Sequence, residues 1–202
     1  MTGANAVVLS FGGRRVARAL AGLRTVEVVD GSGIDEAIAD VHRVIVVGSA
    51  ADLAAVLTRL LRTERLDVEV AHLRGRRGAR RARTAVAQRV PLIRDETGQV
   101  IVGASYWMPA EGADTITGEG VVDDTVLFDG GAPGVQIEPM ATVPGLRAAV
   151  LTPRWRRKHW VTGRAAQLGT TGALVVRDGV SAARPVRRST FYRHIEGWLQ
   201  VR

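Results

Sequence analysis

The first third of the chain alternates between strand-like segments, glycine-containing turns and helical segments, and this alternation constrains the fold more than any other feature. Apolar or alternating segments typical of strands lie at 6–11, 25–30, 42–47 and 67–73. Apolar residues at helical spacing lie between them, at 14–23, 34–41 and 51–66. Parallel neighbours in a sheet need crossover connections of this kind. The pattern therefore predicts an α/β lobe with a parallel sheet over residues 1–73.

The pattern changes after this lobe. Residues 74–89 are rich in arginine, which indicates a solvated helix or a mobile loop that joins two lobes. From residue 90 onward, short strand-like runs alternate with Gly, Pro and Asp turns, which is typical of an antiparallel sandwich or barrel. Two dipeptides have the composition of hairpin turns, Thr97-Gly98 and Asp178-Gly179. We therefore expect a mostly antiparallel β-rich lobe over 90–202, with 74–89 as an arginine-rich connector.

Composition excludes several classes of protein. The 202 residues include no cysteine, so disulfides, thiolate metal sites and cysteine nucleophiles are absent. No apolar run reaches the ~18 residues of a membrane-spanning helix, and no basic segment precedes an apolar stretch at the N-terminus. The zinc-protease pattern H-E-x-x-H and the hydrolase pattern G-x-S-x-G are both missing. We expect a cytoplasmic globular protein.

The net charge of +8 is distributed unevenly along the chain. Residues 73–94 carry eight arginines and no acid, whereas residues 95–153 carry one arginine against nine acids. Residues 154–202 carry eleven basic residues against two acids. Arginine suits phosphate, but its abundance is also a product of GC-rich coding. The distribution leaves open an anion-binding surface, a compositional bias, or a homo-oligomer in which basic segments meet the acidic segment of a neighbour.

A glycine turn after the first expected strand is a candidate phosphate site. Gly12 and Gly13 permit close approach to the backbone, and the expected helix that follows begins with Arg14 and Arg15. Exposed backbone N–H groups and two guanidinium groups at such a place would together hold a phosphate. The segment matches neither G-x-x-x-x-G-K-[ST] nor G-x-G-x-x-G. The alternative is an ordinary strand-to-helix turn without a ligand.

A second candidate follows the most apolar strand, where open α/β sheets commonly bind ligands. Its sequence is GSAAD, and the residues considered for phosphate or nucleotide binding are Gly48, Ser49 and Asp52. The alternative is structural, because Ser49 or Asp52 could cap the long helix that follows.

The layout resembles the diacylglycerol kinase and NAD kinase superfamily. The resemblance rests on the α/β lobe, on the turn and helix after the third strand, and on a β-rich lobe that contains GRAAQL and LVVRDGVSAARPVRR. In that superfamily a GGDGT-type turn follows the strand, nucleotide phosphates bind there in the cleft between lobes, and a DGE-type turn lies in the β lobe. The corresponding turns here are residues 48–52 and Asp178-Gly179-Val180. The resemblance implies a phosphate-bearing nucleotide or phospholipid bound between the lobes, with ATP and Mg²⁺ as cofactors of an active member.

Both turns depart from the superfamily pattern. The first has one glycine, and Ala50 stands where an acid is expected; the second continues with Val180. A phosphate-binding turn without its acid lacks a magnesium or substrate contact. We therefore predict a divergent, non-catalytic member that binds a phosphate-bearing nucleotide or lipid. A catalytic member would be a phosphotransferase.

Acidic residues in the middle of the chain are candidate magnesium ligands. Asp123 and Asp124, with Glu119 and Asp129 nearby, would supply the carboxylate oxygens that Mg²⁺ prefers. Aspartates between two strands also commonly form turns, so both interpretations stay open.

Two basic clusters are candidate anion-binding surfaces. They contain Arg76, Arg77, Arg80 and Arg81 in the first cluster, and Arg156, Arg157 and Lys158 in the second. Trp155 and Trp160 lie on either side of the second cluster, and this mixture suits stacking on bases or the interface of an anionic membrane. The alternative function is therefore a non-enzymatic module that binds nucleic acid or an anionic membrane. For the second cluster, a strand with one solvated basic face is the structural alternative.

Overall fold

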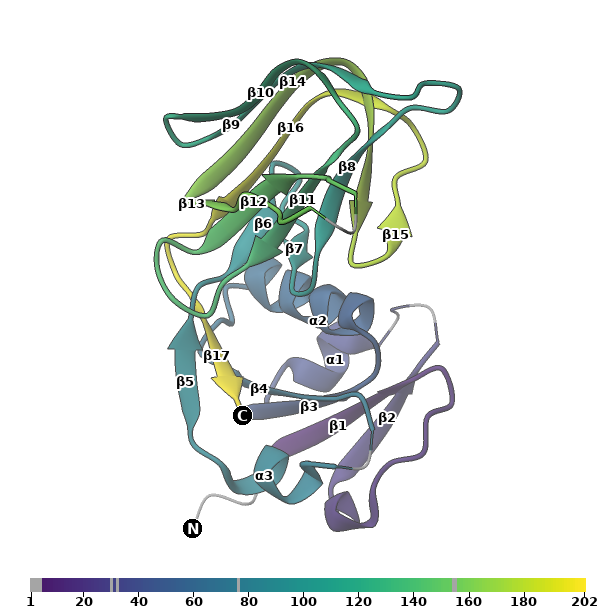
Figure 1. Ribbon diagram of the computed structural model, residues 1–202. Helices are drawn as coiled ribbons and strands as arrows, with labels where there is room; N and C mark the ends of the chain where they lie inside the picture. The colour runs from purple at the N-terminus through teal and green to yellow at the C-terminus, as the bar shows by residue number, and fades with distance from the viewer. Residues whose placement is uncertain (1–4, 30, 32, 76, 154–155) are drawn as a thin grey trace. The chain divides into compact units, whose positions relative to one another are not determined.

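The computed structural model describes residues 5–29, 31, 33–75, 77–153 and 156–202. It divides into two compact units: unit 1 comprises Met1–Val90 and Glu196–Arg202, and unit 2 comprises Pro91–Ile195. Each unit is built on its own sheet (Figure 1). In the described part of the chain, no helix combines the length and the hydropathy that a membrane crossing requires.

Unit 1 contains a six-stranded sheet in the order β2-β1-β3-β4-β17-β5. The strands are β1 (Ala6–Phe11), β2 (Arg24–Val28), β3 (Arg43–Val47), β4 (Glu69–Leu73), β5 (Ala87–Val90) and β17 (Trp198–Val201). Every neighbouring pair is parallel except β17 and β5. The parallel sheet expected for the first lobe is therefore confirmed.

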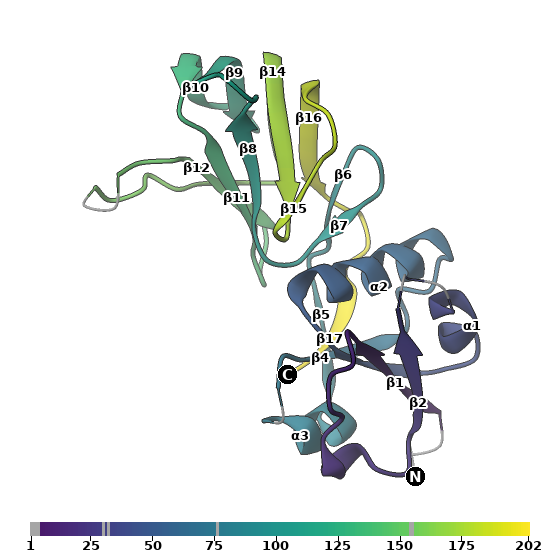
Figure 2. The same ribbon diagram turned by 90° about the vertical axis from the view of Figure 1, so that its right-hand side faces the viewer.

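Helical elements cover both faces of this sheet (Figures 1 and 2). They are η1 (Arg18–Leu20), α1 (Ile34–Ile38), α2 (Ala50–Arg62) and α3 (Ala79–Thr84). On one face, α1 packs against α2, which buries its apolar side. On the other, Leu20 of η1 and Ala79 and Ala82 of α3 share a core with Ile45 and Ala71 of the sheet. Unit 1 therefore has three layers, as a parallel sheet with two apolar faces requires.

The helix expected over residues 14–23 is wrong. Only η1, a 3-10 turn of three residues, forms there. Ala17, which precedes η1, has no side chain that could cap a helix. Gly22 follows with a positive φ of 88°, a conformation that ends helices. The apolar spacing of the segment reflects the burial of Leu20 in a short crossover and not a full helix.

The two units differ from the expected segments 1–73, 74–89 and 90–202. Segment 74–89 contributes α3 and most of β5 to unit 1. The last strand, β17, pairs with β4 on one side and β5 on the other. Because β17 lies between β4 and β5, it supplies hydrogen-bond partners to the backbone groups of each of these two strands on the side that faces it. The sequence pattern of the last segment predicts a strand, but it does not indicate which of the two sheets that strand joins.

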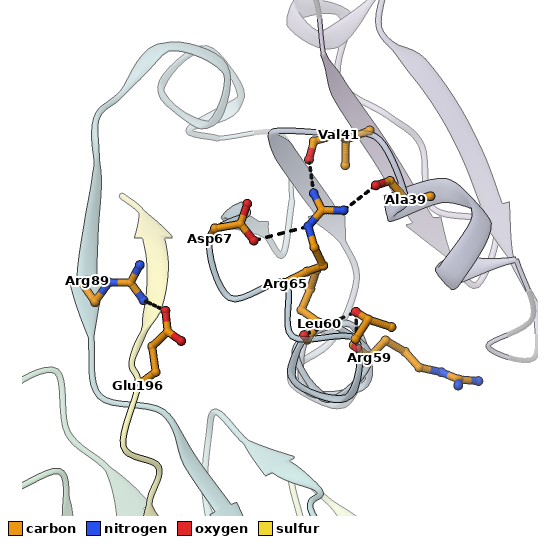
Figure 3. A network of polar contacts seen from close by, with 9 residues as sticks. Ala39, Val41, Arg59, Leu60, Arg65, Asp67, Arg89 and Glu196 are labelled. Carbon is orange, nitrogen blue, oxygen red and sulfur yellow. Dashed lines mark hydrogen bonds and ion pairs between the residues drawn. The ribbon is translucent and has the colours of Figure 1, made fainter.

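Two arginines form hydrogen bonds and an ion pair at the edge of the unit 1 sheet where the parallel strands begin (Figure 3). The guanidinium group of Arg65 donates to the backbone oxygens of Ala39 and of Val41, the latter at 3.0 Å. Arg89 on β5 pairs with Glu196, just before β17, at 2.8 Å. These arginines are engaged in structural contacts at the edge opposite to the candidate site described below.

Unit 2 is an eleven-stranded antiparallel sheet. Its strands are β6 (Ile93–Asp95), β7 (Val100–Ile101), β8 (Ser105–Pro109), β9 (Ile116–Val122), β10 (Thr125–Ala132), β11 (Val135–Pro139), β12 (Leu146–Val150), β13 (Val161–Gly163), β14 (Ala165–Arg177), β15 (Val180–Ser181) and β16 (Val186–Arg193). Every pair between these described strands is antiparallel, which confirms the β-rich second lobe. Its core includes Trp107 and Phe191, whose ring centroids are 6.1 Å apart.

Both expected hairpin turns are present in unit 2. Gly98, with a φ of 83°, lies in the turn between β6 and β7. Asp178 and Gly179, with φ of 49° and 89°, join β14 to β15, where Arg177 pairs with Val180. Two successive positive φ angles are typical of the two-residue hairpin turn that matches strand twist.

Candidate functional site

The candidate site lies in unit 1, at the edge of the sheet where β1, β3 and β4 end. Strands β1 and β3 are neighbours, with Ser10 opposite Val47, so the two glycine turns leave adjacent strands at the same edge. Ligands of open parallel sheets bind at this carboxyl-terminal edge. The structure therefore brings together the two turns that the sequence singles out.

The turn after β1 has an open backbone. Gly12 and Gly13 both adopt positive φ, 62° and 65°. A Cβ built on Gly12 would meet no atom within 4 Å. The Ser10 hydroxyl donates to the backbone oxygen of Arg14 at 2.9 Å, which folds the turn back onto β1. A Cβ on Gly13 would lie 4.0 Å from Glu27 Oε1, so the backbone is open to a ligand at Gly12 in particular.

Two cations follow this turn. Arg14 and Arg15 are both exposed, and neither forms an ion pair with any carboxylate in the described ranges. Arg14 Nη1 lies 3.5 Å from the backbone oxygen of Arg74, directly after β4. Beside the turn, a hollow of about 490 Å³ is lined by residues 15–19, with Arg15 and Arg18 among them. Guanidinium groups without carboxylate partners suit phosphate oxygens.

The turn after β3 is a helix cap. Ser49 Oγ accepts a hydrogen bond from the backbone N–H of Asp52 at 3.2 Å. The Asp52 carboxylate in turn accepts from the backbone N–H of Ser49 at 2.7 Å and from its hydroxyl at 2.8 Å. A Cβ on Gly48 would lie 2.6 Å from this carboxylate, so only glycine fits. The capping interpretation of Ser49 and Asp52 is confirmed.

The start of α2 nevertheless keeps two backbone donors. The first hydrogen bond of the helix runs from the N–H of Leu53 to the oxygen of Ser49, at 3.2 Å. The N–H groups of Ala50 and Ala51 have no acceptor among the described residues, as is usual in a first helical turn. They lie at the positive end of the helix dipole, although the Asp52 carboxylate offsets part of that potential.

His72 on β4 is a site residue that sequence reasoning missed. Its Nε2 lies 3.1 Å from the backbone oxygen of Gly48, so the neutral ring donates there. Burial lowers the pKa of His72 below its usual value, the charge of Arg74 also lowers it, and the hydrogen bond to Gly48 acts in the opposite direction. The available signal was its place one residue before the end of an expected strand.

Comparison with known proteins identifies the fold. No model of a known protein family matches the chain, and no curated protein matches it. Among solved structures, a diacylglycerol kinase from Bacillus anthracis str. Sterne matches with a TM-score of 0.75 and 12% identity, over 98% of this chain and 96% of that chain. An NAD kinase from Archaeoglobus fulgidus in complex with ATP matches with a TM-score of 0.66 and 12% identity, over 98% and 93%. This chain has the diacylglycerol kinase and NAD kinase-like fold.

Within the kinase-like fold, the turn at Asp178 and Gly179 makes internal contacts. The Asp178 carboxylate accepts hydrogen bonds from the backbone N–H groups of Val102 at 3.1 Å and Gly103 at 2.6 Å. This carboxylate therefore fixes the loop between β7 and β8.

The acidic candidates at the β9–β10 hairpin also make turn contacts. The Asp123 carboxylate accepts from the backbone N–H groups of Arg164 and Ala165, each at 2.9 Å. Asp123 itself adopts a positive φ of 49°, and Asp124 completes the two-residue turn. No group of three or more His, Cys, Asp or Glu side chains that could hold a metal occurs in the described part of the chain. The Asp123 carboxylate is therefore engaged by backbone groups of its own unit.

The two basic clusters belong to different units. In unit 1, Arg77, Arg80 and Arg81 are exposed, while Arg76 falls outside the described residues. The sequence did not single out Arg83, which is exposed in the same segment.

The second cluster lies in unit 2. Arg156 and Arg157 are exposed there, and Trp155 falls outside the described residues. The Lys158 ammonium donates to Gln136 and lies 5.6 Å from the ring centroid of Trp160. Lys158 is therefore engaged in contacts within its own unit.

The lowered pKa of His72 predicts a specific acid sensitivity. Because the unfolded chain binds this proton more readily than the folded protein, protonation favours unfolding. The contribution of the neutral ring is complete above the unfolded pKa of about 6.5 and is lost as the pH falls through that value toward the lowered pKa. His72→Gln should therefore flatten the loss of unfolding free energy between about pH 7 and pH 5 in urea titrations. The exposed His159 is the control, and an equal flattening in His159→Gln would contradict the prediction.

Proposed function

We propose that this chain is a non-catalytic protein of the kinase-like fold that binds a phosphate-bearing ligand, in the first place a nucleotide, at the carboxyl-terminal edge of its parallel sheet. The observation that carries the proposal is the open Gly12-Gly13 turn followed by two exposed arginines without carboxylate partners. Backbone donors at a turn and arginine forks are the groups that proteins use for phosphate oxygens.

A second pair of donors supports the same location. Ala50 and Ala51 are the first two residues of α2, which follows β3, the strand adjacent to β1. Their backbone N–H groups are the second pair of donors. A phosphate between the two turns would accept from these groups while Arg14 and Arg15 balance its charge. The solved NAD kinase structure in complex with ATP favours a nucleotide over a phospholipid as the ligand.

Two features support binding without phosphoryl transfer. Positioning of metal and nucleophile supplies most of the catalysis in phosphoryl transfer. At the turn after β3, the Asp52 carboxylate already accepts two hydrogen bonds from Ser49, and Ala50 supplies no acid. The carboxylate of Asp123 is likewise used by backbone N–H groups. We therefore assign no protein-held Mg²⁺ and no transfer step.

The test is a calorimetric titration with ATP in the presence of Mg²⁺, with a short-chain phosphatidic acid as the lipid arm. Wild type should bind ATP saturably, and Arg14→Gln/Arg15→Gln should raise the Kd about tenfold or more, since tenfold corresponds to ~1.4 kcal/mol. Arg24→Gln, an exposed arginine where β2 begins, is a control that should leave the Kd unchanged.

Three results would contradict the proposal. The first is equal weakening in the Arg14/Arg15 variant and in the Arg24 control, which would indicate a net-charge effect. The second is tighter binding of the phosphatidic acid than of ATP, which would replace the nucleotide by a lipid. The third is ATP turnover to ADP above the rate without protein, because the proposal assigns no transfer step.

A further inference from the structure

A second set of exposed arginines lies on η1, on α3 and just before α3, and its member Arg18 also lines the hollow beside the Gly12-Gly13 turn. We define the cationic face by five exposed arginines, Arg18, Arg77, Arg80, Arg81 and Arg83. None of them forms an ion pair with a carboxylate of the described chain.

Packing explains why these arginines point to solvent. Helix α3 is attached through Ala79 and Ala82, which lie three residues apart on one side and are 3% and 4% exposed. Leu20 of η1 is buried in the same core. Arg80, Arg81 and Arg83 occupy other positions of α3 and Arg18 begins η1, so these four side chains project outward. Arg77 lies just before α3. Both elements lie on the same face of the unit 1 sheet (Figures 1 and 2).

The sequence around the face contains nothing to neutralise it. No acidic residue occurs in residues 1–26 or in residues 70–94. A cluster of like charges without local compensation produces a potential that attracts polyanions and is screened by salt. Arginine adds bidentate hydrogen bonds to phosphate, which lysine does not make.

The chemistry of the face selects among polyanions. No aromatic residue occurs in residues 12–28 or 74–90, so the face offers no platform for stacking unpaired bases. It also lacks the tryptophan and tyrosine side chains that favour a membrane interface, and Val86 is its sole large exposed apolar neighbour among the described residues of 74–90. Helix α3, with six residues, is about 9 Å long, too short to read bases deep in a groove. With unpaired bases, a membrane interface and base readout in a groove disfavoured, the polyanion that suits the cationic face is the phosphate backbone of a duplex.

We propose that the cationic face binds the phosphate backbone of duplex nucleic acid without sequence preference. Each arginine would release condensed counterions on contact with a phosphate, so affinity would fall steeply with salt. The arginines of α3 are not among those assigned to nucleotide binding, so substitutions on α3 test this function separately from the Gly12-Gly13 turn.

The test compares two variants of equal charge change by fluorescence anisotropy with two unrelated duplexes of about 20 base pairs. The first is Arg80→Gln/Arg81→Gln/Arg83→Gln on α3. The second is Arg184→Gln/Arg187→Gln/Arg188→Gln in unit 2, where all three arginines are exposed and outside the described ion pairs. The α3 variant should bind about tenfold or more weakly, and its slope of log K against log salt should fall in magnitude by about 3. The unit 2 variant should match wild type.

The wild type and the two triple variants also test whether the substitutions disturb folding and whether the partner is nucleic acid or a membrane. Circular dichroism and the Tm of both variants should match wild type, since solvated arginines contribute little to stability. Equal loss of binding in both variants, a strong preference for one duplex sequence, or no duplex binding by wild type would overturn the proposal. So would tighter binding of wild type to phosphatidylserine vesicles than to duplexes at equal salt, because the partner would then be a membrane.

Discussion

Replacing Asp95 by alanine is expected to lower the free energy of unfolding by about 3–5 kcal/mol, the largest change we predict for a single residue. Asp95 ends β6 and is fully buried. Its Oδ2 accepts from Arg177 Nε at 2.6 Å. Its Oδ1 accepts from the backbone N–H of Thr97 at 2.8 Å, from the Thr97 hydroxyl at 2.7 Å and from the N–H of Gln99 at 2.9 Å. One carboxylate therefore holds the β6–β7 turn and neutralises a guanidinium group.

Alanine at this position would leave that guanidinium group without a partner. The Arg177 side chain is 17% exposed, so water can replace the lost contact in part only. Urea denaturation measures the effect. Asp129, an exposed carboxylate on β10, is the matched control, and Asp129→Ala should change the free energy by less than about 0.5 kcal/mol. A loss below ~1 kcal/mol for Asp95→Ala would show that the turn does not depend on this carboxylate.

The second large effect is expected at Arg43, which joins α3 to the sheet of unit 1. Its Nε donates to Glu69 at 2.6 Å, and its Nη1 and Nη2 donate to the backbone oxygens of Ala82 at 3.2 Å and Ala85 at 2.9 Å. The side chains of Arg43 and Glu69 are 13% and 17% exposed. Arg43→Leu should therefore cost about 3 kcal/mol, because it leaves a carboxylate and two helix-end carbonyls without their donor.

The matched control for Arg43 is Arg59, whose pair with Asp35 is about half exposed. Arg59→Leu should cost at most ~1 kcal/mol. Hydrogen exchange gives a local readout, because the amides of Ala82 and Ala85 are bonded within α3 and its last turn. Their protection should fall in Arg43→Leu and stay unchanged in Arg59→Leu. Unchanged protection in Arg43→Leu would contradict the assignment of Arg43 as the anchor of α3.

Strands β1 to β4 of the first lobe were predictable as elements of a parallel sheet, because each has an apolar or alternating pattern of its own. Strands whose sequence is explained only by contacts with other strands, such as β9, could not be predicted in this way. Strand β9 contains Gly118 and Gly120, which are unfavourable in strands. The backbone of β14 and the ring of Phe128 explain both glycines, since a Cβ on Gly118 would lie 2.0 Å from the oxygen of Gly169 and one on Gly120 would lie 2.4 Å from the ring. Gly169 is distant in sequence and Phe128 lies on the neighbouring strand of the hairpin, so strand pairing explains these glycines and no pattern within β9 indicates them.

The candidate site was predictable in its location and less so in its roles. Strand–glycine–helix patterns place ligand turns at one sheet edge, and the structure has both turns there. The role of Asp52 depended on geometry, because a carboxylate three residues after Ser49 serves equally as a cap or as a ligand until its hydrogen bonds are known. His72 could not be connected with Gly48 from the sequence, because their contact follows from the pairing of β3 with β4.

The most direct test of ligand binding at the carboxyl-terminal edge is the titration of ¹⁵N-labelled protein with ATP, followed through backbone amide chemical shifts. The account predicts saturable shifts of the amides of Gly12 and Gly13, which lie in the exposed turn, and of Ala50 and Ala51, which have no acceptor among the described residues. Arg14→Gln/Arg15→Gln should move these same amides to saturation at about tenfold higher ATP. An absence of shifts at both turns, or shifts confined to residues 77–83 of the cationic face, would contradict the account.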